Sequence, residues 1–246
     1  MRYLLLSDLH ANWEALQAVL EDARGRYDRI LCCGDIVGYG PDPNLVADWA
    51  RSNLDEVIRG NHDRVCCGLE DLEWFNPVAQ AASLWTMTQL TAANLSWLRG
   101  LGRGPLPLDG FSLAHGSPLD EDEYIASVSD AANIFGYLES NLTFFGHTHL
   151  QGGFEWAKGK IRKIAKPRVD QAFVRYPVDP DAAWLINPGS VGQPRDADPR
   201  AAYAIFEQDK MHVLLHRVPY HYGAVRRKIE MAGLPPALGA RLAVGR

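Results

Sequence analysis

The sequence has few cysteines, and their arrangement suggests no disulfide framework. The four cysteines form two adjacent pairs, Cys32-Cys33 and Cys66-Cys67, a spacing that suits neither disulfide-rich folds nor zinc sites. A chain of 246 residues buries enough surface to hold a core without disulfides. We expect the thiols in the apolar run around Cys32 to behave as small buried hydrophobic groups.

The sequence also lacks a long apolar run. The N-terminal stretch Tyr3–Leu6 is too short for a signal peptide, and a polar residue follows it directly. No segment approaches the roughly 20 apolar residues that a membrane-spanning helix needs. We therefore expect a cytoplasmic protein with no membrane partner.

A strong positive charge is absent as well. The formal net charge is -5, whereas nucleic-acid-binding proteins usually carry a basic stripe. The densest basic stretch, from Lys158 to Arg168, is more typical of a solvated hairpin face. The charge therefore argues against a nucleic-acid partner, although a nucleotide stays a candidate ligand. The sequence does not indicate the oligomeric state.

The first third of the chain alternates short apolar runs with helical periodicity. Strands are expected at Tyr3–Leu6, Ile30–Cys33 and Glu56–Ile58, with helices between them. Asn12 stands where the N-cap of the first helix belongs, and the second helix is expected over residues 44–53. This order predicts an α/β fold with parallel crossovers.

The remainder of the chain adds helices and further strands. Two helices are expected over Pro77–Leu101, broken near Thr91, another over Ala131–Glu139, and a last one from about Tyr222. A hairpin is expected over Gly153–Ile164. Further strands are expected at Phe111–Ala114, Thr143–Phe145, Trp184–Ile186, Ala202–Phe206 and Met211–Val218. Without repeats or an obvious linker, the chain is interpreted as one domain, 1–246, with a helical insertion at about 70–101.

Polar side chains follow the predicted strands at the point where each strand ends. Carboxyl ends of strands form ligand sites in open α/β sheets, so these side chains should converge. Gly146-His147-Thr148-His149 would place both imidazoles on one side of an extended backbone. Each motif alone is more typical of a turn or a core residue, but together they predict a metal site. The candidate ligands are Asp8, His10, Asp35, Asn61, His115, His147 and His149.

The order of these motifs resembles the calcineurin-like metallophosphoesterases. The residues that carry the resemblance are Asp8-Leu9-His10, Gly34-Asp35, Gly60-Asn61-His62-Asp63, His115 and Gly146-His147-Thr148-His149. Two further stretches, Val37–Asn44 and Asn187–Asp196, are similar to a bacterial and archaeal branch of small phosphodiesterase-like members. The resemblance implies an α/β/β/α sandwich, in which two mixed sheets are flanked by helices.

The same resemblance implies two divalent metal ions. Asp8, His10, Asp35 and His149 would hold the first ion. Asp35, Asn61, His115 and His147 would hold the second, so that Asp35 bridges both. Imidazole and oxygen ligands without thiolates suit manganese, iron, zinc or nickel. A metal pair about 3.5–4 Å apart generates hydroxide and clamps both oxygens of an in-line displacement.

The residues left over after the ligands are candidates for catalysis and substrate binding. The family pattern places His62 beside the leaving group, where it would assist departure of the oxygen. Asp63 would orient His62 or, equally, cap a turn. Arg59 and Arg195 are candidate phosphate contacts, with a surface ion pair as the alternative. The Trp74-Phe75 pair would stack a nucleobase over the metals or pack in the core.

The resulting hypothesis is a dinuclear hydrolase of phosphate mono- or diesters. The alternative is a metal-binding interaction scaffold of the same fold with little or no turnover. Such a scaffold would be expected to lose His10, His62 or His115, and all are present. A nuclease, the third alternative, would need a basic groove that this acidic chain does not indicate.

Overall fold

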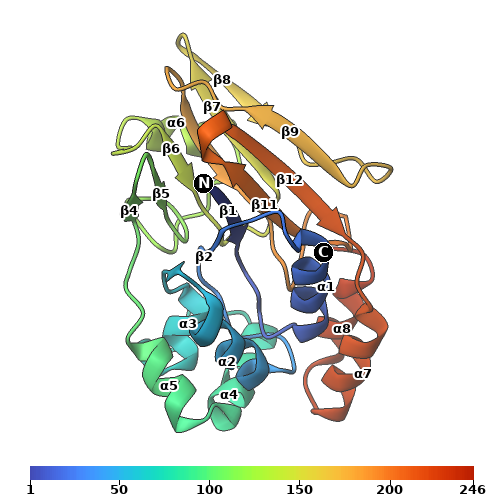
Figure 1. Cartoon of the computed structure of the whole chain (residues 1–246). Coiled ribbons are helices and arrows are strands. Elements are labelled where there is room, and N and C mark those ends of the chain that lie inside the picture. Colours follow the sequence, from blue (N-terminus) through green and yellow to red (C-terminus); the bar gives the residue numbers. More distant parts are fainter.

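The protein stacks two six-stranded sheets between helices (Figure 1). The computed structural model describes all residues, Met1–Arg246. The first sheet has the order β3 (Glu56–Val57), β2 (Arg29–Cys32), β1 (Arg2–Leu6), β11 (Ala201–Glu207), β12 (His212–Val218) and β9 (Phe173–Pro177). The second has the order β4 (Leu106–Leu108), β5 (Phe111–Leu113), β6 (Leu142–Phe144), β10 (Ala183–Asn187), β7 (Gly152–Ala157) and β8 (Lys160–Ile164).

Both sheets are mixed. In the first, β1, β2 and β3 are parallel, and β11, β12 and β9 continue the sheet antiparallel. In the second, β5, β6 and β10 are parallel, and β4, β7 and β8 pair antiparallel at the flanks. The predicted α/β fold with two mixed sheets is therefore confirmed.

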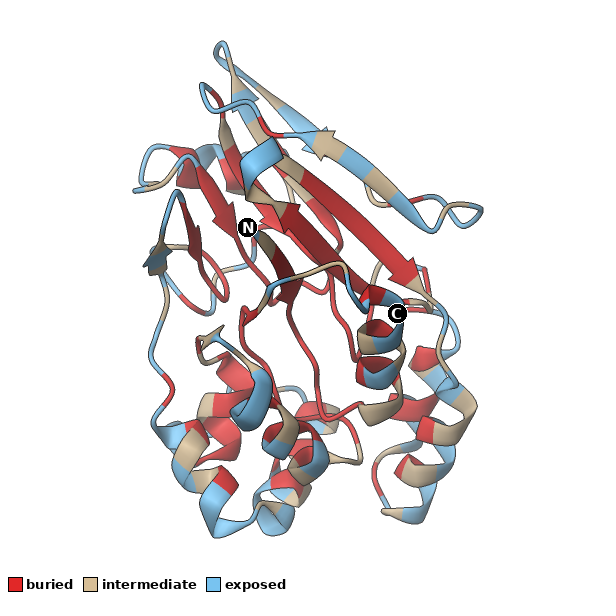
Figure 2. Ribbon diagram, viewed as in Figure 1, coloured by how far each residue is buried: buried red, intermediate tan, exposed pale blue.

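The alternation of side chains along β1 explains how the layers stack. Leu4 and Leu6 point to the outer core, which α1 (Trp13–Ala23), α2 (Pro43–Asn53) and α5 (Ala92–Arg99) cover. Leu5 points instead into the core between the sheets, together with Phe144 and Phe206. The helix α6 (Val128–Phe135) covers the outer face of the second sheet. Figure 2 shows the central strands buried, whereas the helices below them are buried on one side and exposed on the other.

Most of the predicted elements are present, with shifted ends. The Asn12 side chain caps α1 by accepting a hydrogen bond from the backbone of Ala15. Thr91 separates α4 (Pro77–Gln89) from α5, as predicted. The helix expected over Ala131–Glu139 lies at Val128–Phe135, because Ser127 and Asp130 form a capping box at its start.

Four α-helices and β-strands were not predicted, and one of them is the short strand β4. The third strand ends at Val57, and the following motif begins a short helix, α3 (Asn61–Cys66). The strand β9 is largely exposed, so it shows no apolar run. The C-terminal region forms two helices, α7 (Tyr222–Met231) and α8 (Pro236–Leu242).

The C-terminal helices are held close to the loop after β2. Their apolar residues pack against Tyr39 in one cluster, whose C-terminal members are Val225, Ile229, Leu234, Leu238 and Leu242. This contact brings the end of the chain to the edge where the predicted metal ligands lie.

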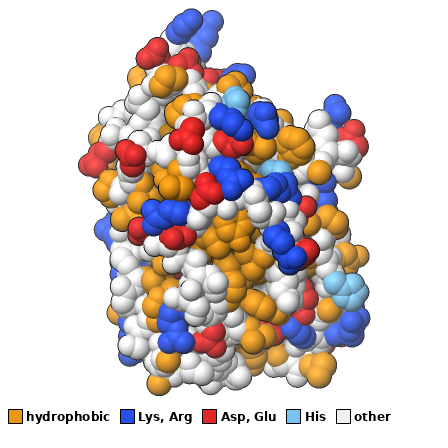
Figure 3. Space-filling view, viewed as in Figure 1, with side chains coloured by type: hydrophobic (Ala, Val, Ile, Leu, Met, Phe, Trp, Pro, Cys, Tyr) orange, Lys and Arg blue, Asp and Glu red, His pale blue; other side chains and the backbone are white.

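The surface carries mixed charges. Figure 3 shows positive and negative side chains interspersed on one face. The basic residues of the β7–β8 hairpin are mostly exposed, as the solvated alternative predicted. No helix of the structure is both long and apolar enough to cross a membrane. The single-domain organisation with an insertion at about 70–101 stays a prediction.

Candidate metal centre

The loops after the parallel strands bring the predicted ligands together. Asp8 and His10 follow β1, Asp35 follows β2, and His115 follows β5. The loop after β6 supplies His147 and His149. Asn61 is the exception, because it is the first residue of α3 rather than the end of a strand.

Five of these residues have a left-handed backbone. The φ angles are 53° at Asp8, 46° at His10, 57° at Asp35, 65° at His147 and 59° at His149. This conformation is unfavourable for residues other than glycine and is concentrated at functional sites. The expectation of an extended backbone at His147 and His149 is therefore wrong, since each ring is directed by a turn.

The ligand atoms form two groups that share Asp35. One group contains Asp8, His10, Asp35 and His149, and the other contains Asp35, His115 and His147, with all donor atoms of a group within 4.8 Å of one another. The side-chain oxygen of Asn61 lies 3.1 Å from ring nitrogens of both His115 and His147. All seven predicted ligands therefore converge, and the Asp and His groups can hold metal ions.

Backbone carbonyls fix the orientation of the imidazoles. The Nδ1 atoms of His10, His115 and His149 lie 3.1, 2.7 and 2.6 Å from the carbonyl oxygens of residues 37, 33 and 193. Since a carbonyl only accepts, each Nδ1 carries a proton, and the neutral form of each ring presents the Nε2 lone pair to the centre. His147 is reversed: its Nε2 donates to a carbonyl 3.1 Å away, and its Nδ1 faces the centre.

The carboxylates at the centre are buried without sufficient partners. The Oδ2 atoms of Asp8 and Asp35 are buried and accept no hydrogen bond. Burial raises the pKa of Asp8 to about 7. A buried carboxylate oxygen that accepts no hydrogen bond is unfavourable unless a cation lies against it, so this donor set fits bound metal ions.

Asp35 and His115 form the strongest charge pair of the centre. Their Oδ2 and Nε2 atoms lie 3.5 Å apart. Burial would lower the pKa of His115, but the Asp35 carboxylate raises it to about 10. Burial would likewise raise the pKa of Asp35, but His115 and the neighbouring imidazoles hold it well below its usual range. The other imidazoles lose basicity through burial, which lowers the pKa of His10 to about 4 and of His147 to about 3.

His62 lies against the centre without joining either group of donors. Its ring centroid lies 4.3 Å from that of Tyr39 and 4.5 Å from that of Phe75. Its backbone N–H donates to Oδ1 of Asp35 over 2.8 Å. Burial lowers its pKa well below the usual value, so the ring is neutral at pH 7. The Nδ1 atom of His62 is buried and has no hydrogen-bond partner, so a proton there would be a buried N–H without an acceptor. The favoured tautomer therefore carries its proton on Nε2.

Asp63 does not orient His62. Its Oδ1 accepts hydrogen bonds from the backbone N–H groups of Ile36 and Val37 over 2.8 and 3.1 Å, and its Oδ2 accepts one from Gly60 over 3.0 Å. These bonds cap α3 and tie it to the loop that carries Asp35. The expected role beside His62 is corrected to the turn-capping alternative.

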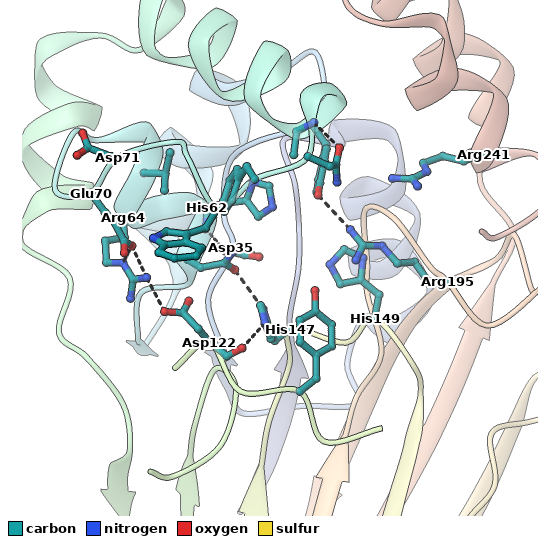
Figure 4. A pocket seen from close by; sticks show the side chains of 18 residues that line it. Asp35, His62, Arg64, Glu70, Asp71, Asp122, His147, His149, Arg195 and Arg241 are labelled. Carbon is teal, nitrogen blue, oxygen red and sulfur yellow. Dashed lines mark hydrogen bonds and ion pairs between the residues drawn. The ribbon is translucent and has the colours of Figure 1, made fainter. Parts of the chain in front are cut away.

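A cavity of about 550 Å³ opens above the centre (Figure 4). Its floor contains Asp35, Asn61, His62, His147 and His149. Trp74 and Phe75 line it, as one alternative predicted, and the Trp74 side chain is 84% exposed. Tyr39 also lines the cavity, from within the Val37–Asn44 motif, although no role was predicted for it. Several further lining residues belong to no motif and were not predicted: Arg64, Glu70, Asp71, Asp122, Tyr124 and Arg241.

The two candidate phosphate-binding arginines differ in position. Arg59 pairs with Glu121 over 2.9 Å and does not line the cavity, so it matches the ion-pair alternative. Arg195 lines the cavity, with its guanidinium carbon 5.6 Å from the centre of the Tyr39 ring. Its backbone N–H donates to the carbonyl of His149 over 3.2 Å, which holds it beside the metal centre.

Comparisons with known proteins agree with this geometry. The calcineurin-like phosphoesterase superfamily domain matches residues 1–211. An uncharacterized protein of Methanocaldococcus jannaschii is 34% identical, with 98% of this chain and 97% of that protein covered. The crystal structure of a metallophosphoesterase from Sphaerobacter thermophilus is 41% identical, with a TM-score of 0.85 and coverage of 100% and 99%. A hypothetical protein from Pyrococcus horikoshii OT3 shares the fold, with a TM-score of 0.78, 19% identity and coverage of 100% and 98%.

Proposed function

The chain belongs to the calcineurin-like phosphoesterase superfamily, and we propose that it hydrolyses phosphate mono- or diesters with two divalent metal ions. The observation that carries this proposal is the pair of buried donor groups that share Asp35 at the floor of an open cavity. Fixed imidazole tautomers and unpartnered carboxylate oxygens support it, because both favour cations over water at this place.

Each metal position has its own set of ligands in this proposal. Asp8, His10 and His149 hold one ion, and Asn61, His115 and His147 hold the other, with Asp35 between them. The oxygen and imidazole donors suit manganese, iron, zinc or nickel. When bound, such a pair activates water at neutral pH and offsets the negative charge of the phosphate.

The neighbouring side chains act on the substrate. His62 presents the N–H of a neutral imidazole to the leaving-group oxygen and stabilises the charge that develops there. Arg195 binds a phosphate oxygen through its planar guanidinium group. The scaffold alternative has no observation in its favour, because every residue that this machinery needs is present, and Asp35, His62 and Arg195 line the cavity.

Aromatic side chains in the walls of the cavity suit a substrate that carries an aromatic group. Trp74 is largely exposed, and the Tyr124 ring lies 4.2 Å from the ring of His147. Exposed rings beside a phosphate site can stack on a nucleobase. We therefore include nucleotides among the candidate substrates, whereas the mixed surface charge does not favour nucleic acid.

A metal-reconstitution assay tests the proposal. Metal-stripped protein is assayed with manganese, iron, zinc and nickel against a panel of phosphate mono- and diesters, and bound metal is counted by elemental analysis. We expect hydrolysis to rise as the second equivalent of metal binds. Full metal occupancy without turnover on any ester would instead support the scaffold alternative.

A further inference from the structure

Two arginines in the cavity wall lie next to each other. The Nη2 atom of Arg195 and the Nη1 atom of Arg241 both donate to the side-chain oxygen of Gln193, over 3.0 and 3.1 Å. Donation to one shared oxygen places the two guanidinium groups close enough for a single tetrahedral anion to contact both. Arg195 comes from the loop after β10, and Arg241 comes from α8.

Neither of these arginines has a carboxylate partner. Other arginines of this region are paired: Arg64 contacts Glu121 and Asp122, and Arg59 contacts Glu121. Arg195 and Arg241 are half-buried, form no ion pair, and the buried Nε of Arg195 has no hydrogen-bond partner. Burial lowers the pKa of Arg241, and the neighbouring Arg195 lowers it further. Two adjacent cations with reduced solvation and no counter-charge favour binding of an anion.

The pair extends away from the metal centre. The backbone N–H of Arg195 donates a hydrogen bond to the carbonyl of His149, and its guanidinium group donates to the Tyr39 hydroxyl over 3.3 Å. Arg241 lies on the far side of Arg195 from Asp35 and His147 (Figure 4). An anion held by both guanidinium groups would therefore lie beside the phosphate at the metals and not in its place.

We propose that Arg195 and Arg241 form a second anion subsite, which binds a phosphate group of the substrate that is not hydrolysed. This inference rests on the proposed function and specifies its substrate class: an organic phosphate with at least two phosphate groups. Guanidinium pairs bind phosphate oxygens through parallel hydrogen bonds, which a neutral substituent would not satisfy. The second phosphate is joined to the first by an anhydride, as in a nucleoside diphosphate, or lies elsewhere on the molecule.

Matched substrates and variants test the subsite. We compare AMP, ADP and adenosine 3′,5′-bisphosphate with the wild-type protein, Arg241→Gln and Arg227→Gln. Arg227 is an exposed control on the preceding helix that does not line the cavity, and its substitution changes the charge equally. Loss of a charge-assisted contact should lower kcat/KM of Arg241→Gln about 10- to 100-fold for a substrate with two phosphates. The substrate, ADP or the bisphosphate, on which Arg241→Gln loses more of its kcat/KM identifies how the second phosphate is attached.

On AMP, kcat/KM of Arg241→Gln should stay within about 3-fold of wild type, because the lost contact is to a group that AMP lacks. An equal loss on AMP would show that Arg241 contacts the hydrolysed phosphate and would overturn the second subsite. No loss on any of the three substrates would overturn it as well.

Equilibrium binding separates this inference from the proposed function. Inorganic diphosphate and orthophosphate are titrated calorimetrically into the metal-loaded full chain. Arg241→Gln should weaken diphosphate about 10-fold or more and leave orthophosphate and the Arg227→Gln variant unchanged. Equal diphosphate affinity in wild type and Arg241→Gln overturns the subsite even if hydrolysis is confirmed. Binding that depends on Arg241 without hydrolysis of any ester keeps the subsite and rejects the proposed hydrolase.

Discussion

The floor and the rim of the cavity are built in different ways. The floor consists of buried side chains on tight loops after parallel strands, with a left-handed backbone at five ligands. The rim comes from α8, from the loop after β10 that carries Arg195, and from the segment between α3 and α6, and its side chains include Trp74, which is 84% exposed. Buried and conformationally fixed groups suit chemistry, whereas exposed groups on separate elements suit recognition.

This difference predicts two kinds of mutational effect. A change in the floor should affect every phosphate ester to a similar degree, because each ester is hydrolysed at the same centre. A change in the rim should depend on the substrate. A rim variant that lost activity equally on all substrates would break the comparison.

The largest effect is expected for Asp35→Asn. Asp35 belongs to both donor groups, so its loss should empty both metal positions. Loss of one preorganised electrostatic contact already costs about 10²–10³-fold, so kcat/KM should fall by at least that factor on every ester. Elemental analysis and kinetics measure it, with Asp63→Asn as a buried carboxylate control that should keep its metals. Retention of two full equivalents in Asp35→Asn would falsify the bridging role.

A large effect that depends on the leaving group is expected for His62→Gln. The variant should keep the metals, since His62 belongs to neither donor group. With a poor leaving group, kcat should fall about 10²–10⁴-fold, and with an activated aryl ester the loss should be smaller. Equal losses on both esters would favour electrostatic stabilisation of the phosphate itself. Loss of metal would place His62 among the ligands and contradict the assignment.

The floor could be predicted from the sequence because its residues lie in short motifs after apolar runs. The parallel strands of one sheet end at one edge, so strand order brings Asp8 and Asp35 together, whereas His115 comes from the second sheet and joins them because the two sheets stack. The rim could not be predicted in the same way. Arg241 reaches the cavity only because α7 and α8 pack on Tyr39, and periodicity predicts a helix without predicting where it packs. The sequence left both roles of Asp63 open, since its partners are backbone N–H groups of a distant loop.

The third prediction concerns pH, to which metal binding at the floor should respond. Metal binding requires neutral His115, whose pKa the Asp35 carboxylate raises to about 10. Below that value a proton must leave, so apparent metal affinity should fall about tenfold for each unit of decreasing pH. Below about 7, protonation of Asp8 should add a second proton to the slope. Unperturbed histidines would instead give loss only below about 6.5.

Competition with a chelating indicator between about pH 6 and 9 measures this slope, with allowance for the protonation of the indicator itself. His115→Gln serves as the matched variant, because it removes the titrating ring and should flatten the upper part of the profile. Constant affinity of the wild-type protein from about pH 7 to 9 would show that His115 is neutral before the metal binds.

The smallest effect is expected for Arg59→Gln, which tests whether pairing distinguishes structural from binding arginines. Two guanidinium nitrogens of Arg59, Nε and Nη2, donate to the Glu121 carboxylate over 3.1 and 2.9 Å, and the Arg59 side chain is 23% exposed. Glu121 keeps Arg64 as a partner in the variant, so the free energy of unfolding should fall by only about 1 kcal/mol, measured by urea denaturation. Because Arg59 does not line the cavity, kcat/KM of Arg59→Gln should stay within about 3-fold of wild type. Arg195 has no carboxylate partner and lines the cavity, so kcat/KM of Arg195→Gln should fall about 10-fold or more. A loss of kcat/KM in Arg59→Gln as large as in Arg195→Gln would mean that an arginine bound to a carboxylate still contributes to substrate binding. The absence of a carboxylate partner would then no longer identify the anion-binding residues of the rim.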